Sequence, residues 1–327
     1  MSISLVDIEA AAHRLDGVGI KTPVLRSAEL DRRVKAQVFL KSECLQHIGA
    51  FKFRGAYNRL VQLDPEARAH GVVAFSSGNH AQGIAYAAQL LGMQATIVMP
   101  SDAPAIKKVG TAALGATIRY YDRHNESREA IAAEIAGKSG AVLVPAFDDK
   151  DVIAGQGTCG LELMQQMREQ GLIPDAVLSP CGGGGLLAGI ATAVRGKNET
   201  TRLFGIEPEG YDDHRQSLHA GRRIKVQAAQ ATLCDALMAP MPGILTWEIN
   251  SQLVSDFLVV SEDEVAHAVS FAFRYLKLVL EPGGAVALAA LLSGKLPAAY
   301  NNIGIILSGG NIDPLTMQAC LDKFPSP

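Results

Sequence analysis

Short apolar runs alternate along most of this chain with longer segments in which apolar residues recur every three or four positions. The apolar runs lie at 38–40, 72–75, 95–99, 117–120, 141–144, 176–178, 202–206, 257–260 and 303–307. Helical spacing covers 5–15, a segment that begins at 79, and 105–114, 127–137, 186–194 and 264–280. Strands separated by helices of this length pair in parallel through right-handed crossovers. The pattern therefore predicts an α/β protein with mainly parallel sheets.

The same alternation predicts two open α/β domains. Residues 71–148 suit a small domain of about four strands, and residues 1–70 together with 149–327 form a larger one. A chain of 327 residues is long enough for two separate cores. Ligands of open α/β sheets bind beyond the carboxyl ends of the strands, so we expect the site in the cleft between the domains. We also expect the small domain to move when that cleft closes.

Composition narrows the class of partner. The formal net charge is −3 and acidic and basic residues are interspersed, so there is neither a basic stripe for nucleic acid nor a cationic amphipathic face for a membrane. No window holds the roughly 18 consecutive apolar residues of a spanning helix, and residues 1–4 lack the basic start of a signal peptide. The five cysteines are scattered without a C-x-x-C pair, which is typical of reduced thiols. We therefore expect a cytoplasmic protein that acts on a small molecule.

The segment 49–56 reads Gly-Ala-Phe-Lys-Phe-Arg-Gly-Ala and places Lys52 in the opening turn of a predicted helix. Burial between Phe51 and Phe53 and the positive end of the helix both favour the neutral amine. A neutral amine attacks carbonyls, and its natural partner is an aldehyde cofactor held as a Schiff base. A lysine taken at random is far more often a surface residue whose stem covers apolar neighbours. The assignment therefore depends on three further motifs.

Each of the three follows a predicted strand. Four consecutive glycines, Gly182, Gly183, Gly184 and Gly185, precede a helix, so that converging N–H groups and the helix end suit a phosphate. Alone they would fit a flexible loop equally well, and neither a dinucleotide fingerprint nor a P-loop accompanies them. The other two motifs are Ser-Ser-Gly-Asn-His at 76–80 and Ser-Gly-Gly-Asn at 308–311. Because all lie at strand ends, we expect them to meet in one cleft.

Together the four motifs resemble those of the pyridoxal-phosphate enzymes of the tryptophan-synthase-β structural class. The closest resemblance is to the serine/threonine dehydratases and serine racemases, including hydroxyaspartate dehydratase-like members. It covers nearly the whole chain, in the family's order and at its approximate spacing. The resemblance implies a tryptophan-synthase-β-like fold, pyridoxal 5'-phosphate in the cleft and a homodimer. It implies cofactor contacts from Phe51, Lys52, Asn79, Gly182, Gly183, Gly184, Gly185 and Ser308.

The resemblance also gives these residues roles. The amide of Asn79 can hydrogen-bond the ring hydroxyl without protonating it. Ser308 faces the pyridine nitrogen, where a hydroxyl leaves that nitrogen largely unprotonated, disfavours transamination and favours loss of a β leaving group. Both would otherwise be read as ordinary cap and turn residues. Substrate contacts are expected from Ser76, Ser77, Gly78, His80 and Arg128.

One of these substrate contacts, Ser77, has a second role, and another, Arg128, has a second interpretation. Ser77 occupies the position that serves as acid and base opposite the lysine in serine racemases, so Lys52 and Ser77 are the expected catalytic pair. Arg128 matches a family arginine near the small domain, but a surface arginine at a helix start explains it equally well.

A metal site is expected in the loop after the strand at 202–206. In many dehydratases and racemases of the family a glutamate, a backbone carbonyl four residues on and an aspartate six residues on bind a divalent cation. These positions fall on Glu207, Tyr211 and Asp213, whose oxygen donors suit Mg²⁺, Mn²⁺ or Ca²⁺. An acidic solvated loop is the alternative. The ion would organise the large domain without touching substrate.

The activity implied is that of an ammonia-lyase that converts a β-hydroxy-α-amino acid into a 2-oxo acid and ammonia. Threonine, serine, 3-hydroxyaspartate and phenylserine are the candidate substrates. Pro240, Met241 and Pro242 make a substrate-facing wall stiffer and more apolar than is usual in the family, which counts against serine. The alternative is a serine or aspartate racemase with side elimination. A binding protein without chemistry is disfavoured by the complete motif set.

Overall fold

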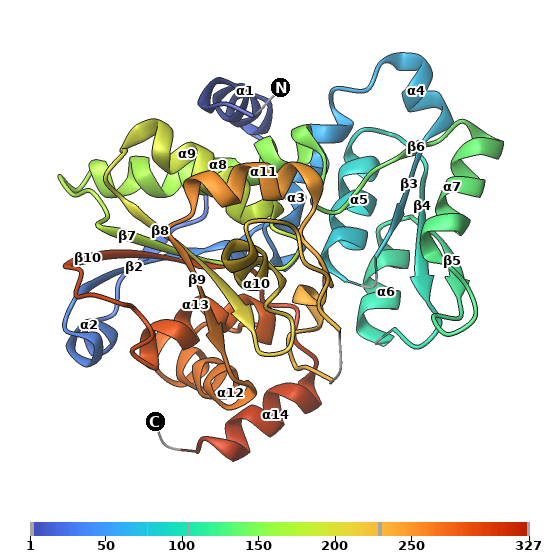
Figure 1. The fold of residues 1–327 in the computed structure, drawn as a ribbon. Coiled ribbons are helices and arrows are strands. Elements are labelled where there is room, and N and C mark those ends of the chain that lie inside the picture. Colours follow the sequence, from blue (N-terminus) through green and yellow to red (C-terminus); the bar gives the residue numbers. More distant parts are fainter. Residues whose placement is uncertain (1–2, 77, 104, 228–230, 326–327) are drawn as a thin grey trace.

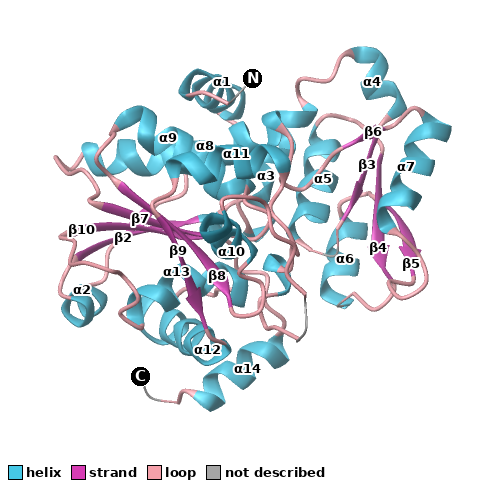
Figure 2. Cartoon of the chain, in the orientation of Figure 1, coloured by secondary structure: helices cyan, strands magenta, loops and turns pink. Residues whose placement is uncertain are grey.

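The computed structural model describes residues 3–76, 78–103, 105–227 and 231–325, and it contains two sheets (Figure 1). The smaller has four parallel strands in the order β5-β4-β3-β6. Its strands are β3 (Val72–Phe75), β4 (Ala95–Pro100), β5 (Thr117–Tyr121) and β6 (Val142–Leu143), and its helices are α5 (Asn79–Leu90), α6 (Ala105–Ala113) and α7 (Arg128–Ser139). In Figures 1 and 2, α7 covers one face and α5 and α6 the other. We call this unit the small lobe and the rest of the chain the large lobe.

The larger sheet has six strands in the order β1-β2-β10-β7-β8-β9, of which β1 alone runs antiparallel to its neighbour. The strands are β1 (Val24–Leu25), β2 (Gln37–Ser42), β7 (Ala176–Pro180), β8 (Arg202–Pro208), β9 (Asp256–Val260) and β10 (Asn302–Leu307). The chain moves outward from β7 to β9 and then returns to the other side of β7 as β10. The strand order therefore reverses between β7 and β10, where open sheets bind ligands.

Helices cover both faces of the six-stranded sheet (Figure 2). One face carries α1 (Leu5–Leu15), α3 (Lys52–Leu60), α8 (Lys150–Arg168), α9 (Gly185–Lys197) and α11 (Ile244–Leu253), and the other carries α2 (Ala28–Val34), α12 (Glu262–Phe271), α13 (Pro282–Leu292) and α14 (Pro314–Lys323). Two short helices, α4 (Pro65–His70) and α10 (Asp213–Ala220), complete the α-helices of the described chain. Among the described helices, none is both long and apolar enough to cross a bilayer.

Glycines let three helices of the large lobe touch through their backbones. A Cβ atom added at Gly155 of α8 would lie 2.5 Å from the carbonyl oxygen of Arg54 in α3, and one added at Gly189 of α9 would lie 2.4 Å from that of Ile153. Contacts this short exclude any side chain. The first turn of α3 is therefore seated directly on α8.

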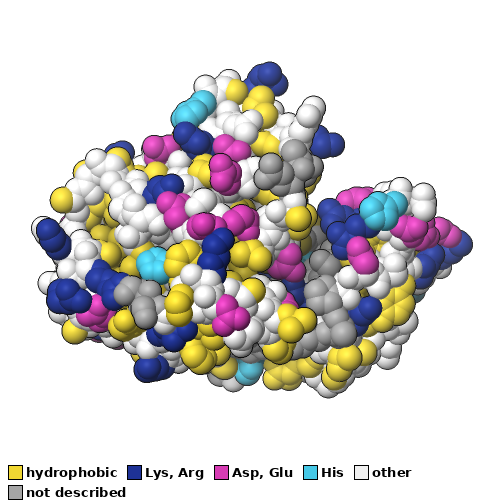
Figure 3. All heavy atoms as spheres, turned by 90° about the horizontal axis from the view of Figure 1, so that it is seen from below, with side chains coloured by type: hydrophobic (Ala, Val, Ile, Leu, Met, Phe, Trp, Pro, Cys, Tyr) yellow, Lys and Arg dark blue, Asp and Glu magenta, His cyan; other side chains and the backbone are white. Residues whose placement is uncertain are grey.

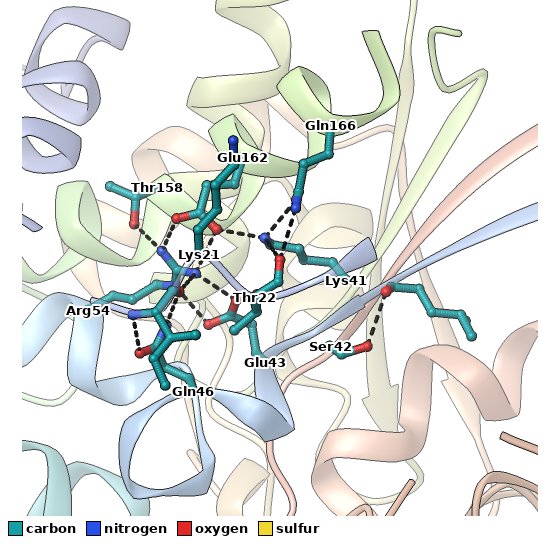
Figure 4. Close-up of polar contacts among 12 residues, drawn as sticks. Lys21, Thr22, Lys41, Ser42, Glu43, Gln46, Arg54, Thr158, Glu162 and Gln166 are labelled. Atoms are coloured by element: carbon teal, nitrogen blue, oxygen red, sulfur yellow. Dashed lines mark hydrogen bonds and ion pairs between the residues drawn. The ribbon is translucent and has the colours of Figure 1, made fainter. Parts of the chain in front are cut away.

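A buried ionic network ties the same turn to the sheet (Figure 4). The guanidinium of Arg54, 1% exposed, donates to the carboxylate of Glu43 at 2.7 and 2.8 Å and to that of Glu162 at 2.6 and 2.9 Å. Lys41 of β2 donates to Glu162 at 2.6 Å and to the carbonyl of Thr22 at 2.7 Å. Two cations and two anions satisfy one another, so the burial of each charge is compensated. The network fixes Arg54, two residues beyond Lys52, to both β2 and α8.

The other face of α3 belongs to the core of the small lobe. Phe53, Tyr57 and Leu60 form one apolar cluster with residues of the four-stranded sheet and of α5, such as Val72 and Ile84. The helix that begins with Lys52 is thus packed between the two lobes, in contact with each.

The structure confirms an α/β fold with mainly parallel sheets, and it corrects one predicted helix. The segment 264–280 is helical only to Phe271; a π-helical turn, Ala272–Leu276, follows, and Lys277 adopts a left-handed conformation with φ of 58°. The apolar spacing continues because Leu278 and Leu280 are buried in the core, although their backbone is not helical. The chain must leave the helix there to reach Pro282, the first residue of α13.

Candidate active site

One pocket between the lobes collects the predicted motifs. Gly182–Gly185 follow β7, Ser308 follows the neighbouring strand β10, and Ser76, Gly78 and Asn79 follow β3 of the small lobe. The pocket is lined, among others, by Phe51, Lys52, Ser76, Gly78, Asn79, His80, Arg128, Gly182, Gly183, Gly184, Gly185 and Ser308. Ser77, the expected partner of the lysine, lies outside the described residues. On the face seen in Figure 3, basic and acidic side chains are interspersed over both lobes.

Lys52 is the first residue of α3, and its Nζ donates to the carbonyl of Ala146 at 2.6 Å. Burial lowers the pKa of the Lys52 amine to about 8, while the nearby carboxylate of Glu281 acts in the opposite direction. The backbone around the lysine is held by the segment that follows β10. Phe51 N–H donates to the carbonyl of Ser308 at 3.1 Å, and Gly310 N–H donates to that of Gly49 at 2.9 Å.

The glycine loop has no room for side chains. A Cβ atom added at Gly183 would lie 2.4 Å from the ring of Phe147, and one added at Gly184, where φ is +92°, would lie 2.6 Å from the ring of His214. Two side chains of α11 bind the carbonyls of the loop. Thr246 Oγ1 donates to the carbonyl of Gly183 at 2.7 Å, and Asn250 Nδ2 donates to that of Gly184 at 3.2 Å. With carbonyls turned back and α9 beginning at Gly185, the loop can offer N–H groups and a helix N-terminus to an anion. These features fit the phosphate of pyridoxal phosphate.

Asn79 begins α5 and is held on both ends of its amide. Its Oδ1 accepts from Asn311 Nδ2 at 2.8 Å, and its Nδ2 donates to the carboxylate of Glu281. Ser308 lies close by at the end of β10 and is 4% exposed. Two polar side chains that suit a pyridine ring, an amide and a hydroxyl, therefore border the same pocket.

His80 lines the pocket with a neutral ring. Burial and the charge of Lys52 lower the pKa of His80 to about 3. Its Nε2 lies 3.1 Å from the carbonyl of Val144, to which a neutral imidazole donates. The His80 side chain is therefore committed to the small-lobe backbone, and what it can offer a substrate carboxylate is its main-chain N–H at the start of α5.

Arg128 begins α7 and also reaches the pocket. Its guanidinium carbon lies 5.2 Å from the centre of the Phe75 ring, a cation–π contact, and its Nε donates to Glu129 at 2.8 Å. No other hydrogen bond or ion pair holds this guanidinium within the part of the chain that the structure describes, so both Nη amines are available to a ligand.

Three charged pocket residues were not found from the sequence. Glu281 is 2% exposed, stands at the N-cap position of α13 without a side-chain capping hydrogen bond, and accepts from Asn79. Lys107 of α6 pairs with Asp235 across the lobes, and the two residues share the pocket lining. Burial raises the pKa of Glu281 to about 7, and the positive charge of Lys107 acts against this rise. The proline after Glu281 is the sequence signal that a helix begins there, but no local pattern indicates that Lys107 reaches the site.

The predicted metal ligands lie together at the end of β8. Glu207 is fully buried and accepts the backbone N–H groups of His214 and Arg215, each at 2.9 Å. Asp213 is also fully buried, and neither of its carboxylate oxygens has a hydrogen-bond partner among the described residues. Burial and the repulsion between the two carboxylates raise the pKa of Glu207 well above its ordinary value, and burial raises that of Asp213 to about 8.

Among the described residues, no three His, Cys, Asp or Glu side chains lie together in a way that could hold a metal ion. The predicted set does not require three such side chains, because it consists of two carboxylates and the backbone carbonyl of Tyr211. The divalent cation therefore stays a prediction.

Comparisons with known proteins agree with this geometry. A family model described as pyridoxal-phosphate dependent enzyme matches residues 15–309. The L-threo-3-hydroxyaspartate ammonia-lyases of Pseudomonas sp and Saccharomyces cerevisiae are 44% and 43% identical to this chain over 307 residues, which make up 94% of this chain and 95% and 93% of the relatives. The solved structure of maize serine racemase superposes with a TM-score of 0.92 at 38% identity, covering 99% of this chain and 98% of that one.

The family predicted from the four motifs is thereby confirmed, as is pyridoxal phosphate as the cofactor that this family uses. The chain belongs to the pyridoxal-phosphate-dependent enzymes, in the group that contains the serine/threonine dehydratases and the serine racemases.

Proposed function

We propose that this protein is a pyridoxal-phosphate-dependent ammonia-lyase whose preferred substrate is 3-hydroxyaspartate. The main support is the position of Arg128, whose two Nη amines are available on the small-lobe side of the pocket. Threonine and serine have no side-chain carboxylate to pair with this cation, whereas 3-hydroxyaspartate has one in addition to its α-carboxylate. The names of the relatives from Pseudomonas sp and Saccharomyces cerevisiae support the same substrate.

The two carboxylates of such a substrate have separate places. The α-carboxylate suits the start of α5, next to Ser76 and Gly78, where the first N–H groups of the helix lack helical partners. The side-chain carboxylate then faces Arg128, held over Phe75 on the same lobe. Lys107 also lies beside Gly78, where an added Cβ atom would be 3.5 Å from its Nζ, but its charge is paired with Asp235. The small-lobe side of the pocket therefore suits a substrate that carries two carboxylates.

Residues of the large lobe supply the rest of the site. When bound, pyridoxal phosphate supplies the electron sink for loss of the α proton and of the β-hydroxyl. Lys52 would hold it, and the glycine loop would receive its phosphate. The free Nζ of Lys52 would act as the base that takes the α proton, and a pKa of about 8 suits an amine to that task near neutral pH. The water lost from the β carbon is returned when the product imine is hydrolysed to a 2-oxo acid and ammonia.

The direct test is substrate profiling. We would measure release of 2-oxo acid and ammonia from 3-hydroxyaspartate, threonine, serine and phenylserine with the cofactor-loaded protein. The proposal requires the highest kcat/KM for 3-hydroxyaspartate. Faster turnover of threonine would overturn the substrate while keeping the lyase, and absence of turnover of all four would overturn the lyase.

Racemisation is the second candidate, and the likeness to maize serine racemase favours it. It needs a proton donor opposite Lys52, the role predicted for Ser77, a residue outside the described part of the chain. Incubating each enantiomer of serine and of aspartate in deuterated water and following the appearance of the other enantiomer separates the two activities. A Ser77→Ala change is expected to stop racemisation and leave elimination.

We further propose that Glu207, Asp213 and the carbonyl of Tyr211 bind a divalent cation. The supporting observation is that both carboxylate oxygens of Asp213 are buried without a hydrogen-bond partner among the described residues, although buried carboxylates are normally paired or coordinate metals. Oxygen donors of this kind suit Mg²⁺, Mn²⁺ or Ca²⁺. The ion would join β8 to the start of α10, away from the substrate.

We also propose a cytoplasmic homodimer. The buried cysteines Cys159, Cys181 and Cys234 have thiol pKa values raised by burial, so they are protonated and unreactive, as suits a protein of a reducing compartment. Light scattering on the eluted protein measures the oligomeric state directly, and a monomer at working concentration would contradict the dimer.

A further inference from the structure

Asn311 lies behind the pocket and joins two segments that form it. Its Nδ2 donates to the backbone carbonyl of Ile48 and to Oδ1 of Asn79, both at 2.8 Å. A side-chain amide has two N–H donors, so both donors of Asn311 are used. Nδ2 of Asn79 in turn donates to the carboxylate of Glu281. The result is one line of hydrogen bonds that runs from the Ile48 carbonyl to a buried carboxylate.

The chemistry of the two ends fixes the direction of every bond in this line. A backbone carbonyl can only accept, so Asn311 must present its nitrogen to Ile48. The second N–H of Asn311 then requires an acceptor, which is Oδ1 of Asn79. This orientation turns Nδ2 of Asn79 toward Glu281, whose carboxylate accepts. One further N–H of Asn79 remains for a ligand in the pocket that it lines.

The segment before Lys52 is bent around this amide. Ile48 has φ of 57° and ψ of 13°, a left-handed conformation that is unusual for a β-branched residue. The next residue, Gly49, has φ of +69°, and a Cβ atom there would lie 2.8 Å from Oδ1 of Asn311. Strain of this kind persists only where the surroundings determine it strongly, and such places concentrate at functional sites. Here the strained turn aims the Ile48 carbonyl at Asn311.

We propose that Asn311 is a positioning residue that locks the Asn79 amide with its N–H groups toward Glu281 and the pocket. Asn79 would then present an N–H donor, and never its amide oxygen, to the ring hydroxyl of pyridoxal phosphate. A donor stabilises the ionised form of that hydroxyl, whereas an oxygen would repel it. Asn311 touches neither cofactor nor substrate in this role; it acts through Asn79.

The test is the change Asn311→Asp, which keeps the shape and replaces the NH₂ group by an acceptor. The carboxylate would oppose both Ile48 and Oδ1 of Asn79, so Asn79 would flip. We expect about tenfold weaker binding of pyridoxal phosphate, the effect of one lost hydrogen bond. We also expect the visible absorption band of the lysine-bound cofactor to move to shorter wavelength. Asn311→Ala, which removes the donors without adding an acceptor, is expected to give a smaller change in the same direction.

Asn58→Asp is the matched control. Asn58 is a buried amide of α3 that donates to Asp151 and accepts from Arg14, away from the pocket. It should lower the melting temperature but leave cofactor affinity and absorption unchanged. If Asn311→Asp and Asn311→Ala lower only the melting temperature, as the control does, then Asn311 has a structural role alone and the proposal is wrong.

Neither readout involves a substrate, so the result does not depend on the proposed reaction. A wild-type protein that binds the cofactor and turns over none of the four substrates would overturn the proposed function and leave the Asn311 test valid. A wild-type protein that takes up no pyridoxal phosphate would overturn both.

Discussion

The backbone N–H of Phe51 donates to the carbonyl of Ser308 at 3.1 Å, which joins the lysine segment directly to the end of β10. Glu281 N–H donates to the carbonyl of Gly309 at 3.1 Å, so the start of α13 is joined to the same segment. These contacts are made by main-chain atoms and survive side-chain substitution. The distance between Lys52 and Ser308 is therefore set by the scaffold, and changes of either side chain test chemistry without moving the site.

The first prediction follows from this scaffold. Lys52→Ala should abolish both the visible absorbance of bound cofactor and the release of 2-oxo acid, because no amine remains to hold the aldehyde. The melting temperature without cofactor should stay close to that of the wild type. Lys138→Ala, at an exposed ion pair with Glu134, serves as the control and should change nothing. Turnover by the Lys52 variant would refute the assignment.

The second prediction concerns pH. Burial lowers the pKa of Lys52 to about 8, so the neutral, reactive amine becomes the main form as the pH rises through 8. The rate at which cofactor-free protein takes up pyridoxal phosphate should therefore rise across that range. Glu281→Gln removes the charge that raises the Lys52 pKa and should move the midpoint to lower pH. A midpoint near 10.4, the value of an exposed lysine, would contradict the burial argument.

The third prediction concerns substrate selection. Arg128→Gln should lower kcat/KM for 3-hydroxyaspartate by about 10- to 100-fold, the value of a hydrogen bond to a charged group. Turnover of threonine, which has no second carboxylate, should be unchanged. Arg123→Gln on the same lobe removes an arginine that pairs with Asp102 outside the pocket lining, and it controls for loss of positive charge. Equal losses of kcat/KM for both substrates would show that Arg128 does not distinguish their side chains.

The fourth prediction concerns the buried ionic network. Glu43→Gln should lower the free energy of unfolding by about 3–5 kcal/mol, because it leaves Arg54 buried with part of its compensation removed. The double change Glu43→Leu with Arg54→Met should cost less, since it removes both charges and Glu162 keeps Lys41. Urea unfolding measures both. A double variant less stable than the single one would mean that the network is worth more than the packing that replaces it.

The fifth prediction concerns the cation. Chelation should lower the melting temperature, and added Mg²⁺ or Mn²⁺ should restore it, with about 2.7 kcal/mol of stabilisation at one hundred times Kd. Asp213→Asn should remove this response. Asp212→Asn changes the neighbouring carboxylate, which is not a predicted ligand, and should keep it. If chelator and cation leave the wild type unchanged, the Glu207 and Asp213 loop holds no ion.

The strand pattern and four motifs were enough to predict the fold class and the place where the motifs meet. This worked because residues that follow parallel strands are brought to one edge whatever the loops do, so Gly182 and Ser308 could be placed from order alone. Arg54 and Lys41 could not be foreseen as a buried network, because charged residues are almost always exposed and their partners lie on other elements.

Glu281 was missed for a similar reason. Its capping position is visible in the sequence, but its approach to Asn79 depends on how α13 meets α5 across the two lobes. The end of the helix at 264–280 was wrong because apolar spacing persists where the chain unwinds into a π turn. Local periodicity reports which residues are buried and does not report how the backbone between them bends.

The position of α3 between the lobes has a mechanical consequence. A Cβ atom added at Gly83 of α5 would lie 3.2 Å from the backbone of Lys52, while Gly155 of α8 presses on Arg54 from the opposite side. If one lobe rotates against the other, we expect these close contacts to keep the displacement smallest near the first turn of α3. We expect Lys52 to lie close to the pivot of such a rotation, and Arg128, which the small lobe carries, to move further. Closure of the cleft would therefore bring Arg128 toward the substrate while Lys52 keeps its position.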